Sequence, residues 1–335
     1  MFDFLKRIAK TTPEVAVEKP SDPDLLLRHL EWTTVRKLDG QLQGDFRTLF
    51  RGVGLMLADL REYQAHDDVR HIDWNVTARM CVPYVREHQE DREISVWFLV
   101  DLTGSIHFGS EKITKSMLAL NYVATLARLL TRHGNRVGAI IYEGPHSVHH
   151  AVIPPRSGRR QVLHLMKRMQ QTSPSHRAGE TNLSDLFGYA QSVIKRRSTV
   201  LVVSDFLSTP GWEAPLRQLG HRHEVVVARL HDPSESELPR AGMILVEDIE
   251  TGEQIFVDSE DSSFRQRFSD QAHALEQKLF DSFQQAGVDC IELDTFESVD
   301  QSLLRFLRLR KRKNQMTRDK TSKNLSMRPT NNQAN

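Results

Sequence analysis

The sequence predicts a doubly wound α/β domain with a mostly parallel sheet. Two wholly apolar runs, ISVWFLV at 94–100 and TVLVV at 199–203, are typical of strands that are buried on both faces. Apolar residues recur at helical spacing in the stretch between them, most clearly over 112–133, which Gly134 ends. Strands and helices that alternate in this way form a parallel sheet covered by helices.

The remaining elements continue the alternation. One hairpin is expected at 136–142 and 148–153, around the turn residues Gly144 and Pro145, and another at 244–246 and 255–257. Further strands are expected at 224–230 and 288–293, and further helices at 159–171, 182–197, 211–219, 262–286 and 300–311.

The chain divides into four parts by composition. Residues 1–23 have the character of a leader and linker, whose first ten residues predict a short docking helix or a frayed end. Residues 24–93 predict an opening helix over 25–38, followed by the short strands and loops of a small β-rich segment. Residues 94–311 form the α/β domain, and residues 312–335 form a basic, disordered tail.

Composition excludes several classes of protein. The 335 residues are 39% apolar and 27% charged, which is typical of a globular chain, and no apolar run is long enough for a membrane-spanning helix. The first residues lack the apolar core of a signal peptide. The two cysteines, Cys81 and Cys290, build neither a disulfide framework nor a thiolate zinc site, so a cytoplasmic location is expected.

Basic residues are concentrated at the C-terminal end. Residues 308–335 contain nine basic residues and one acidic residue, and few apolar ones. No aromatic residue lies among them to stack on bases, so nucleic acid is not an expected partner. A membrane surface is a weaker candidate, and a solvated, solubilising tail is the preferred interpretation.

Polar side chains follow the predicted buried strands. Asp101, Thr103 and Ser105 come after the first strand, Asp205 comes after the strand 199–203, and Thr181 precedes the helix 182–197. Because the carboxyl ends of parallel strands meet at one edge of the sheet, we expect the five side chains to converge. Taken singly, each also suits a helix cap or a turn, and Thr181 suits the N-cap of its helix.

Oxygen ligands of this kind favour a hard divalent cation. Carboxylates and hydroxyls suit Mg²⁺, with Mn²⁺ as an alternative, and they leave the ion able to accept a carboxylate from another molecule. The pattern therefore predicts a metal-dependent binding site more than a catalytic one.

Two motifs resemble known families. Residues 101–105, DLTGS, resemble the D-x-S-x-S signature of von Willebrand factor A domains, whose metal-ion-dependent adhesion site (MIDAS) also takes a Thr and an Asp from later loops, where Thr181 and Asp205 stand. Residues 61–74, REYQAHDDVRHIDW, resemble the R-x-Y-x-x-G-D-D-x-R-x-I-D-W block of the bacterial domain-of-unknown-function 58 family. The motifs HDP at 231–233 and ELP at 237–239 resemble a later part of that family. Thr103 keeps the hydroxyl of the usual Ser, whereas His66 replaces the usual Gly.

The resemblance covers roughly residues 45–310 and implies a von Willebrand factor A-like domain after a small β-rich segment. Proteins of this family are typically encoded with MoxR-type AAA+ ATPases and are regarded as their adaptors or co-chaperones. The expected function is thus that of a non-enzymatic, Mg²⁺-dependent protein-binding adaptor, in which a client protein contributes an Asp or a Glu to the metal.

A metal-dependent hydrolase is the alternative. It would use the edge of the sheet at which Asp101 and Asp205 are expected, which we call the rim. Otherwise it would use a cluster of acids and histidines, namely His66, Asp67, Asp68, His71 and Asp73. An ion-paired network explains that cluster more simply, with Arg61, Arg70 and Arg79 as its bases and Trp74 as an apolar anchor against the sheet. The chain has no P-loop, no dinucleotide-binding G-x-G-x-x-G after the first strand and no G-x-S-x-G elbow.

Overall fold

The structure is a computed structural model of the chain. It describes residues 8–10, 22–41, 60–64, 67, 69, 72–80, 82–86, 95–107, 113–145, 150–172, 180–238, 240–248, 254–310 and 312. Among these residues, no helix combines the length and the apolar character needed to cross a bilayer.

The central sheet has six strands in the order β11-β8-β7-β4-β5-β6. All neighbouring pairs are parallel except β5 and β6, which form the antiparallel hairpin expected at this edge. This arrangement confirms the predicted fold class. The strands are β4 (Ser95–Asp101), β5 (Arg136–Tyr142), β6 (Ala151–Arg156), β7 (Thr199–Ser204), β8 (Glu224–His231) and β11 (Asp289–Asp294).

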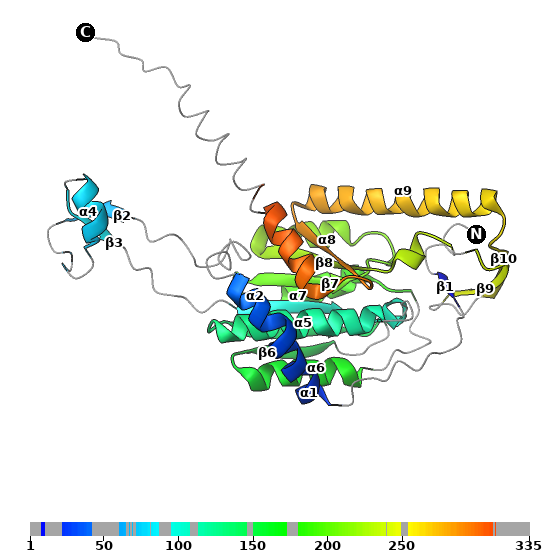
Figure 1. Cartoon of the computed structure of the whole chain (residues 1–335), viewed down its shortest axis with the longest axis horizontal. Coiled ribbons are helices and arrows are strands. Elements are labelled where there is room, and N and C mark those ends of the chain that lie inside the picture. The colour runs from blue at the N-terminus through cyan, green and yellow to red at the C-terminus, as the bar shows by residue number, and fades with distance from the viewer. Residues whose placement is uncertain are drawn as a thin grey trace, which may run out of the picture.

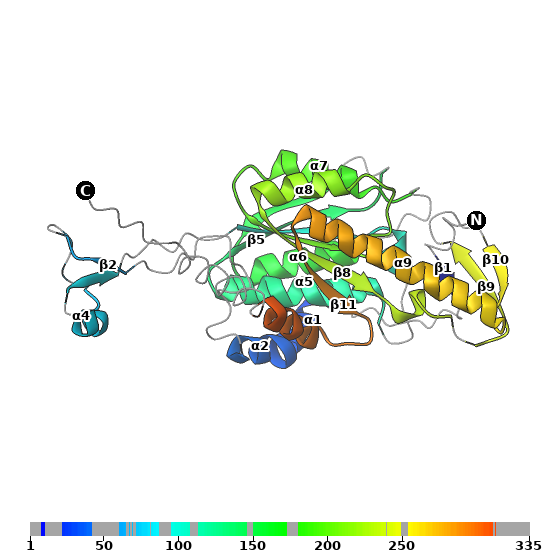
Figure 2. The ribbon, with the colours of Figure 1, turned by 90° about the horizontal axis from the view of Figure 1, so that it is seen from above.

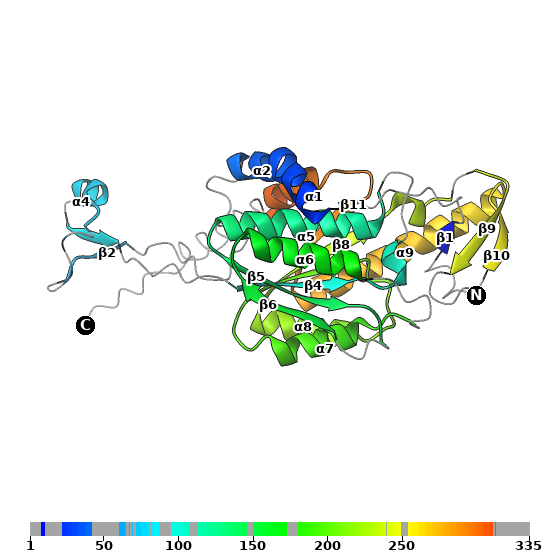
Figure 3. The same cartoon turned by 90° about the horizontal axis from the view of Figure 1, so that it is seen from below.

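Helices cover both faces of the sheet because the central strands are apolar on both sides. In β4, Val96, Phe98 and Val100 belong to one core cluster, whereas Trp97 and Leu99 belong to the other. Figure 3 shows α5 and α6 on one side of the sheet and α7 and α8 on the other. The helices are α5 (Lys115–Arg132), α6 (Arg159–Gln171), α7 (Leu183–Val193), α8 (Glu213–Arg222) and α9 (Ser262–Ala286).

The opening helix is part of this body. It runs without a break through α1 (Pro23–Leu30), the π-helical turn η2 (Glu31–Val35) and α2 (Arg36–Gln41), and it begins at the N-cap Asp22. Its buried side chains join the core cluster of α5 and α6, namely Leu27, Leu30, Val35 and Leu38. The sequence assigned this stretch to the small β-rich segment, but its apolar stripe packs on the α/β domain.

The last helix, 299–310, packs beside the opening helix, as all three ribbon views show (Figure 1). Lys37 of α2 donates to the Asp300 carboxylate at 2.5 Å. At the other end of the helix, Arg310 contacts Glu224 at 2.7 Å and Asp289 at 3.2 Å, and these contacts join the helix to the first residues of β8 and β11.

A second, three-stranded sheet has the order β1-β9-β10. Its hairpin, β9 (Met243–Asp248) and β10 (Gln254–Asp258), is the one the sequence predicts. Its third strand, β1 (Ile8–Lys10), pairs antiparallel with β9. The expectation of a helix at these residues was wrong, because their backbone pairs with a strand edge.

A small unit contains β2 (Leu60–Glu62), β3 (Tyr84–Arg86) and α4 (Trp74–Met80), and it lies apart from the sheet domain in all three views (Figures 1, 2 and 3). Trp74 is 69% exposed. The expectation that Trp74 anchors this unit against the sheet was wrong. The Arg61 and Arg70 side chains, which the same interpretation used, lie outside the described residues.

Candidate functional site

Asp101 is the last residue of β4 and is fully buried. Its Oδ1 accepts hydrogen bonds from the Thr103 amide at 3.1 Å and from the Thr103 hydroxyl at 2.8 Å. Its Oδ2 accepts one from the Ser204 hydroxyl at 2.7 Å. Since Ser204 ends β7, this last bond joins the carboxyl ends of two adjacent parallel strands. The structure thus places Asp101 at the edge of the sheet where the sequence predicts the candidate side chains to meet.

Thr103 and Ser105 lie together on the loop after β4. The hydroxyl oxygens of the two residues are 3.4 Å apart, and both side chains are buried. A 3₁₀ turn, Gly104–His107, brings Ser105 back toward Thr103. The structure thus gathers Asp101, Thr103 and Ser105, as their alternating spacing predicts.

Asp205 follows β7 directly and is also buried. Its Oδ1 accepts from the Leu207 amide at 3.1 Å. The residue between them, Phe206, has a φ of 61°, in the left-handed region that a bulky side chain rarely adopts. Phe206 packs edge-to-face on Trp212 and Phe283, with ring centroids 5.2 and 4.8 Å away. This packing stabilises a backbone turn that costs roughly 1–3 kcal/mol.

Thr181 is fully buried in the loop before α7. Its carbonyl accepts from the Thr209 amide at 2.9 Å and the Ser208 hydroxyl at 3.1 Å, which ties it to the loop after β7. The N-cap of α7 is Asn182, so the capping interpretation of Thr181 was wrong. The Asn182 amide donates to the Tyr142 hydroxyl at 3.2 Å, and Tyr142 pairs with Asp101 in the sheet, so Thr181 lies on the same rim.

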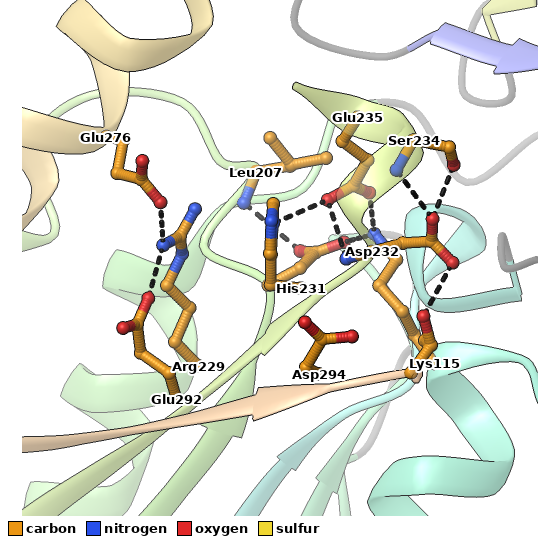
Figure 4. A network of polar contacts seen from close by, with 12 residues as sticks. Lys115, Leu207, Arg229, His231, Asp232, Ser234, Glu235, Glu276, Glu292 and Asp294 are labelled. Carbon is orange, nitrogen blue, oxygen red and sulfur yellow. Dashed lines mark hydrogen bonds and ion pairs between the residues drawn. The ribbon is translucent and has the colours of Figure 1, made fainter. Parts of the chain in front are cut away.

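Sequence reasoning missed a buried lysine beside the rim. Lys115, the first residue of α5, has a side chain that is 0% exposed. Its ammonium donates to Asp205 Oδ2 at 2.7 Å and to Glu235 Oε1 at 2.5 Å (Figure 4). The apolar spacing of the helix did not predict that this side chain is buried, because a lysine at the start of a helix is normally exposed to solvent.

Glu235 continues the network toward β11. It lies in the capping box of the 3₁₀ turn η5 (Pro233–Glu235), in which the Asp232 side chain accepts from the Ser234 amide at 2.9 Å. The other Asp232 oxygen accepts from the Thr295 hydroxyl at 2.8 Å, just beyond β11. The HDP motif at 231–233 was the available signal for this turn.

Figure 4 also shows a second ion-paired group on the neighbouring strands. The buried Arg229 of β8 lies between Glu276 of α9, at 2.5 Å, and Glu292 of β11, at 2.9 Å. Its guanidinium also lies 5.4 Å from the Phe280 ring centroid. These contacts join β8, α9 and β11.

The electrostatics of the rim favour a cation. Burial and, to a lesser degree, the nearby charge of Asp205 together raise the pKa of Asp101 to about 7. Burial also acts to raise the pKa of Glu235, but the charge of Lys115 and the hydrogen bonds from His231 and Lys115 together outweigh it and hold that pKa at about 2. When Asp101, Asp205 and Glu235 are ionised, Lys115 balances only one of their three charges. A divalent cation would balance the remainder.

The donor set fits Mg²⁺ or Mn²⁺. Two carboxylates and the hydroxyls of Thr103 and Ser105 are hard oxygen donors. The site has two carboxylates and not three. Within the described ranges, no group of three or more His, Cys, Asp or Glu side chains is placed to hold a metal ion. The arrangement suits magnesium coordination supported by water, and it contains no clustered nitrogen or sulfur ligands for zinc.

The alternative hydrolase cluster is only partly described. His66, Asp68 and His71 lie outside the described residues. Asp67 accepts from the Gln64 amide at 2.8 Å, and Asp73, which precedes α4, accepts from the Val76 amide at 3.3 Å. Both contacts are local turn and cap interactions.

Comparisons with known proteins agree with the motifs. The family model described as protein of unknown function DUF58 matches residues 59–278. Uncharacterized protein Rv1480 of Mycobacterium tuberculosis is 35% identical over 294 residues, which cover 87% of this chain and 91% of that protein.

The chain was also compared with solved structures, and two of the matches cover most of the matched chain. BatB from Bacteroides thetaiotaomicron has a TM-score of 0.37 and 12% identity, over 64% of this chain and 99% of that one. The SpRpn10 VWA domain has a TM-score of 0.33 and 12% identity, over 63% of this chain and 94% of that one. The six-stranded, mostly parallel sheet flanked by helices agrees with the fold class that the sequence predicts. With the family match over most of its length, the chain belongs to the DUF58 family of proteins of unknown function.

Proposed function

We propose that the protein is a non-enzymatic, Mg²⁺-dependent protein-binding module. Asp101, Thr103 and Ser105 would hold the ion, and Thr181 and Asp205 would complete its shell directly or through water. The bound ion supplies a positive charge that can accept a carboxylate from a partner protein. No nucleophile or general base is needed for this function.

One observation carries the proposal: the two rim carboxylates converge within a buried shell of hydroxyl groups. Asp101 and Asp205 are close enough for the charge of one to raise the pKa of the other. A buried pair of like charges is unfavourable unless a cation or a proton compensates it. The single charge of Lys115 is shared between Asp205 and Glu235, and Asp101 accepts hydrogen bonds from the Thr103 amide and from the Thr103 and Ser204 hydroxyls.

Lys115 and the hydroxyl groups would also orient the ligands. The ammonium holds Asp205 Oδ2, the Leu207 amide holds Oδ1, and the Ser204 hydroxyl holds Asp101 Oδ2. Outer contacts of this kind fix the rotamers of metal ligands, and their removal typically lowers metal affinity by about 10–100-fold. The rim is thus preorganised by its own side chains.

Calorimetric titration with Mg²⁺ and Mn²⁺ tests the site. We expect Asp101→Asn to abolish measurable binding and Ser105→Ala to weaken it by about ten-fold or more, because each removes a hard oxygen donor. The matched control is Ser192→Ala on α7, whose hydroxyl is exposed and donates only to the Tyr189 carbonyl, and which should bind as the unchanged protein does. Circular dichroism checks that each variant is folded. Equal affinity in all variants would contradict the proposal.

The partner proposed is a MoxR-type AAA+ ATPase, with a client protein contributing an Asp or a Glu to the ion. The support is the family membership together with the site chemistry. A pull-down with the ATPase encoded nearest the gene, in Mg²⁺ and in EDTA, tests it. We expect retention that is lost in EDTA and in the Asp101→Asn variant. Retention that ignores both changes would rule out a metal-bridged complex.

A further inference from the structure

The opening helix and the last helix form one surface away from the rim. We call the helix 22–41 the strap and the helix 299–310, with residue 312, the C-terminal helix. They lie side by side in all three views, with α1 and α2 next to the last helix (Figure 2). The bond between Lys37 and Asp300 joins them at 2.5 Å.

Asp22, the N-cap at the start of the strap, is exposed, and within the described residues 23–40, 299–310 and 312 the exposed side chains include no acid. On the strap the exposed residues are Leu25, Arg28, His29, Trp32, Thr33, Arg36, Lys37 and Gly40. On the C-terminal helix they are Gln301, Arg305, Arg308, Leu309 and Arg312. The outward surface is therefore basic, with apolar residues among the bases.

The acids of the strap after Asp22 are half-buried and pair with bases of the domain beneath. Asp24 contacts Arg159 of α6 at 2.6 Å, and Glu31 pairs with Arg128 of α5. Asp39 contacts Arg132 at 3.1 Å and His133 at 3.0 Å.

Some of the outward bases are also paired. Asp24 contacts Arg28 at 2.8 Å, Asp300 contacts Lys37 at 2.5 Å, and Glu297 contacts Arg305 at 2.7 Å. Among the described residues, no ion pair joins Arg36, Arg308 or Arg312 to an acid, so these three carry the net positive charge of the face.

Large apolar side chains also point outward from this face. Trp32 is 69% exposed, Leu25 is 63% exposed and Leu309 is 57% exposed. The Arg36 guanidinium lies 4.1 Å from the Trp32 ring centroid, so the indole is held beside a positive charge. An exposed Trp with aliphatic neighbours and flanking bases is the composition of helices that lie in the interface of a bilayer.

We propose that this face, formed by the strap and the C-terminal helix, docks on a membrane surface that contains anionic lipids. Arg28, Arg36, Arg308 and Arg312 would meet lipid headgroups, and Trp32 with Leu25 and Leu309 would enter the boundary with the acyl chains. Five more basic residues follow in the sequence 313–335 and would add to the attraction. This inference does not depend on the metal site.

Lipid fits this face better than nucleic acid does. Nucleic-acid surfaces combine bases with several aromatic side chains on which nucleotides stack. Here Trp32 stands among aliphatic residues, and leucine side chains gain free energy in the acyl boundary but not on a phosphate backbone. The face also presents a single aromatic side chain in the described part of the two helices.

Vesicle flotation with the full chain tests the proposal. We expect binding to vesicles of phosphatidylcholine and phosphatidylserine at 3:1, and little binding to pure phosphatidylcholine. Arg28→Glu with Arg36→Glu should weaken binding by about ten-fold or more, since each base near an anionic surface contributes about five-fold. The matched control reverses two exposed bases of the opposite layer, Arg217→Glu with Arg267→Glu, and should bind as before. Thermal unfolding confirms that both variants fold.

Tryptophan fluorescence gives a second measurement. In a Trp74→Phe background, the remaining Trp97 and Trp212 are buried, so a blue shift on adding anionic vesicles reports Trp32. Trp32→Phe should remove the shift. Equal flotation with neutral vesicles, full binding by the Arg28 and Arg36 variant, or loss of binding only when residues 313–335 are deleted would each overturn the proposal. So would binding to duplex DNA or to RNA without binding to vesicles.

Discussion

The ammonium of Lys115 lies 2.7 Å from the Asp205 carboxylate, although the two residues are 90 positions apart in the chain. Both side chains are inaccessible to solvent, at 0% and 1% exposure. Lys115 is the first residue of α5, where the positive end of the helix dipole disfavours a cation. Its position is therefore acceptable only because Asp205 and Glu235 surround the charge.

Replacing Lys115 tests how much the stability of the protein depends on its ammonium group. We expect Lys115→Met to lower the free energy of unfolding by about 3–5 kcal/mol, because it leaves two buried carboxylates without their cation. Urea denaturation at pH 7 measures the change. The control Lys167→Met removes an exposed lysine of α6 and should change stability by less than about 0.5 kcal/mol. A similar small loss for both variants would show that the buried pair contributes little.

The raised pKa of Asp101 predicts a pH dependence of stability. Between its ordinary value of 3.8 and about 7, the folded protein holds a proton that the unfolded chain releases. Stability should therefore fall as the pH rises from 5 to 7, by up to about 1.4 kcal/mol per pH unit from this group. Glu235 has a lowered pKa and loses its contribution only below about pH 4.5, outside this window.

The matched variant for this experiment is Asp101→Asn, which cannot ionise. Urea denaturation of the unchanged protein and of the variant, in metal-free buffer at pH 5, 6 and 7, measures the difference between their free energies of unfolding. This difference should be smaller at pH 5 than at pH 7, because only the unchanged protein loses stability as residue 101 ionises. A difference that does not change with pH would mean that Asp101 titrates as it does in the unfolded chain.

The sequence was sufficient for the sheet because its signals are local. The apolar runs at 94–100 and 199–203 can be buried only in central strands, and the edge rule for parallel sheets then placed Asp101 and Asp205 together. The convergence of Asp101, Thr103 and Ser105 was predicted from their alternation along the loop, whereas the order of the strands, with β4 between β7 and β5, was not predicted.

The parts that sequence missed depend on contacts between distant segments. Lys115 is buried by Asp205 and Glu235, which no helical pattern reveals. Residues 8–10 form a strand because β9 offers an edge, so their own helical spacing was misleading. Trp74 was expected in an interface by its type, yet whether an aromatic side chain is covered depends on what packs against it.

Replacement by alanine should have opposite effects on stability at two glycines, Gly138 in β5, where β6 approaches closely, and Gly188 in α7. A Cβ at Gly138 would lie 2.7 Å from the Ile153 carbonyl oxygen and 2.9 Å from the Pro155 nitrogen, beside the irregular register of this hairpin. Because both obstacles are backbone atoms, Gly138→Ala should lower the stability by about 1–3 kcal/mol. At Gly188, inside α7, a Cβ would meet nothing within 4 Å, so Gly188→Ala should raise it by roughly 0.5–1 kcal/mol. Thermal unfolding should therefore move in opposite directions for the two variants, and a shared direction would contradict this geometry.

A last prediction concerns whether the strap unfolds together with the sheet domain or separately from it. Leu27 is fully buried in the cluster beneath α5 and α6, whereas Leu25, two positions earlier, is 63% exposed. Leu27→Ala should lower the free energy of unfolding by about 2–5 kcal/mol through lost burial and a cavity, in a single cooperative transition with the sheet. Leu25→Ala should change it by less than about 0.5 kcal/mol. If Leu27→Ala instead produces a separate early transition and leaves the main one unmoved, the strap unfolds independently and the core does not extend to it. If Leu27→Ala shifts a single transition, the strap and the sheet domain unfold together. The outer face of the strap then belongs to the same cooperative unit as Asp101 and Asp205.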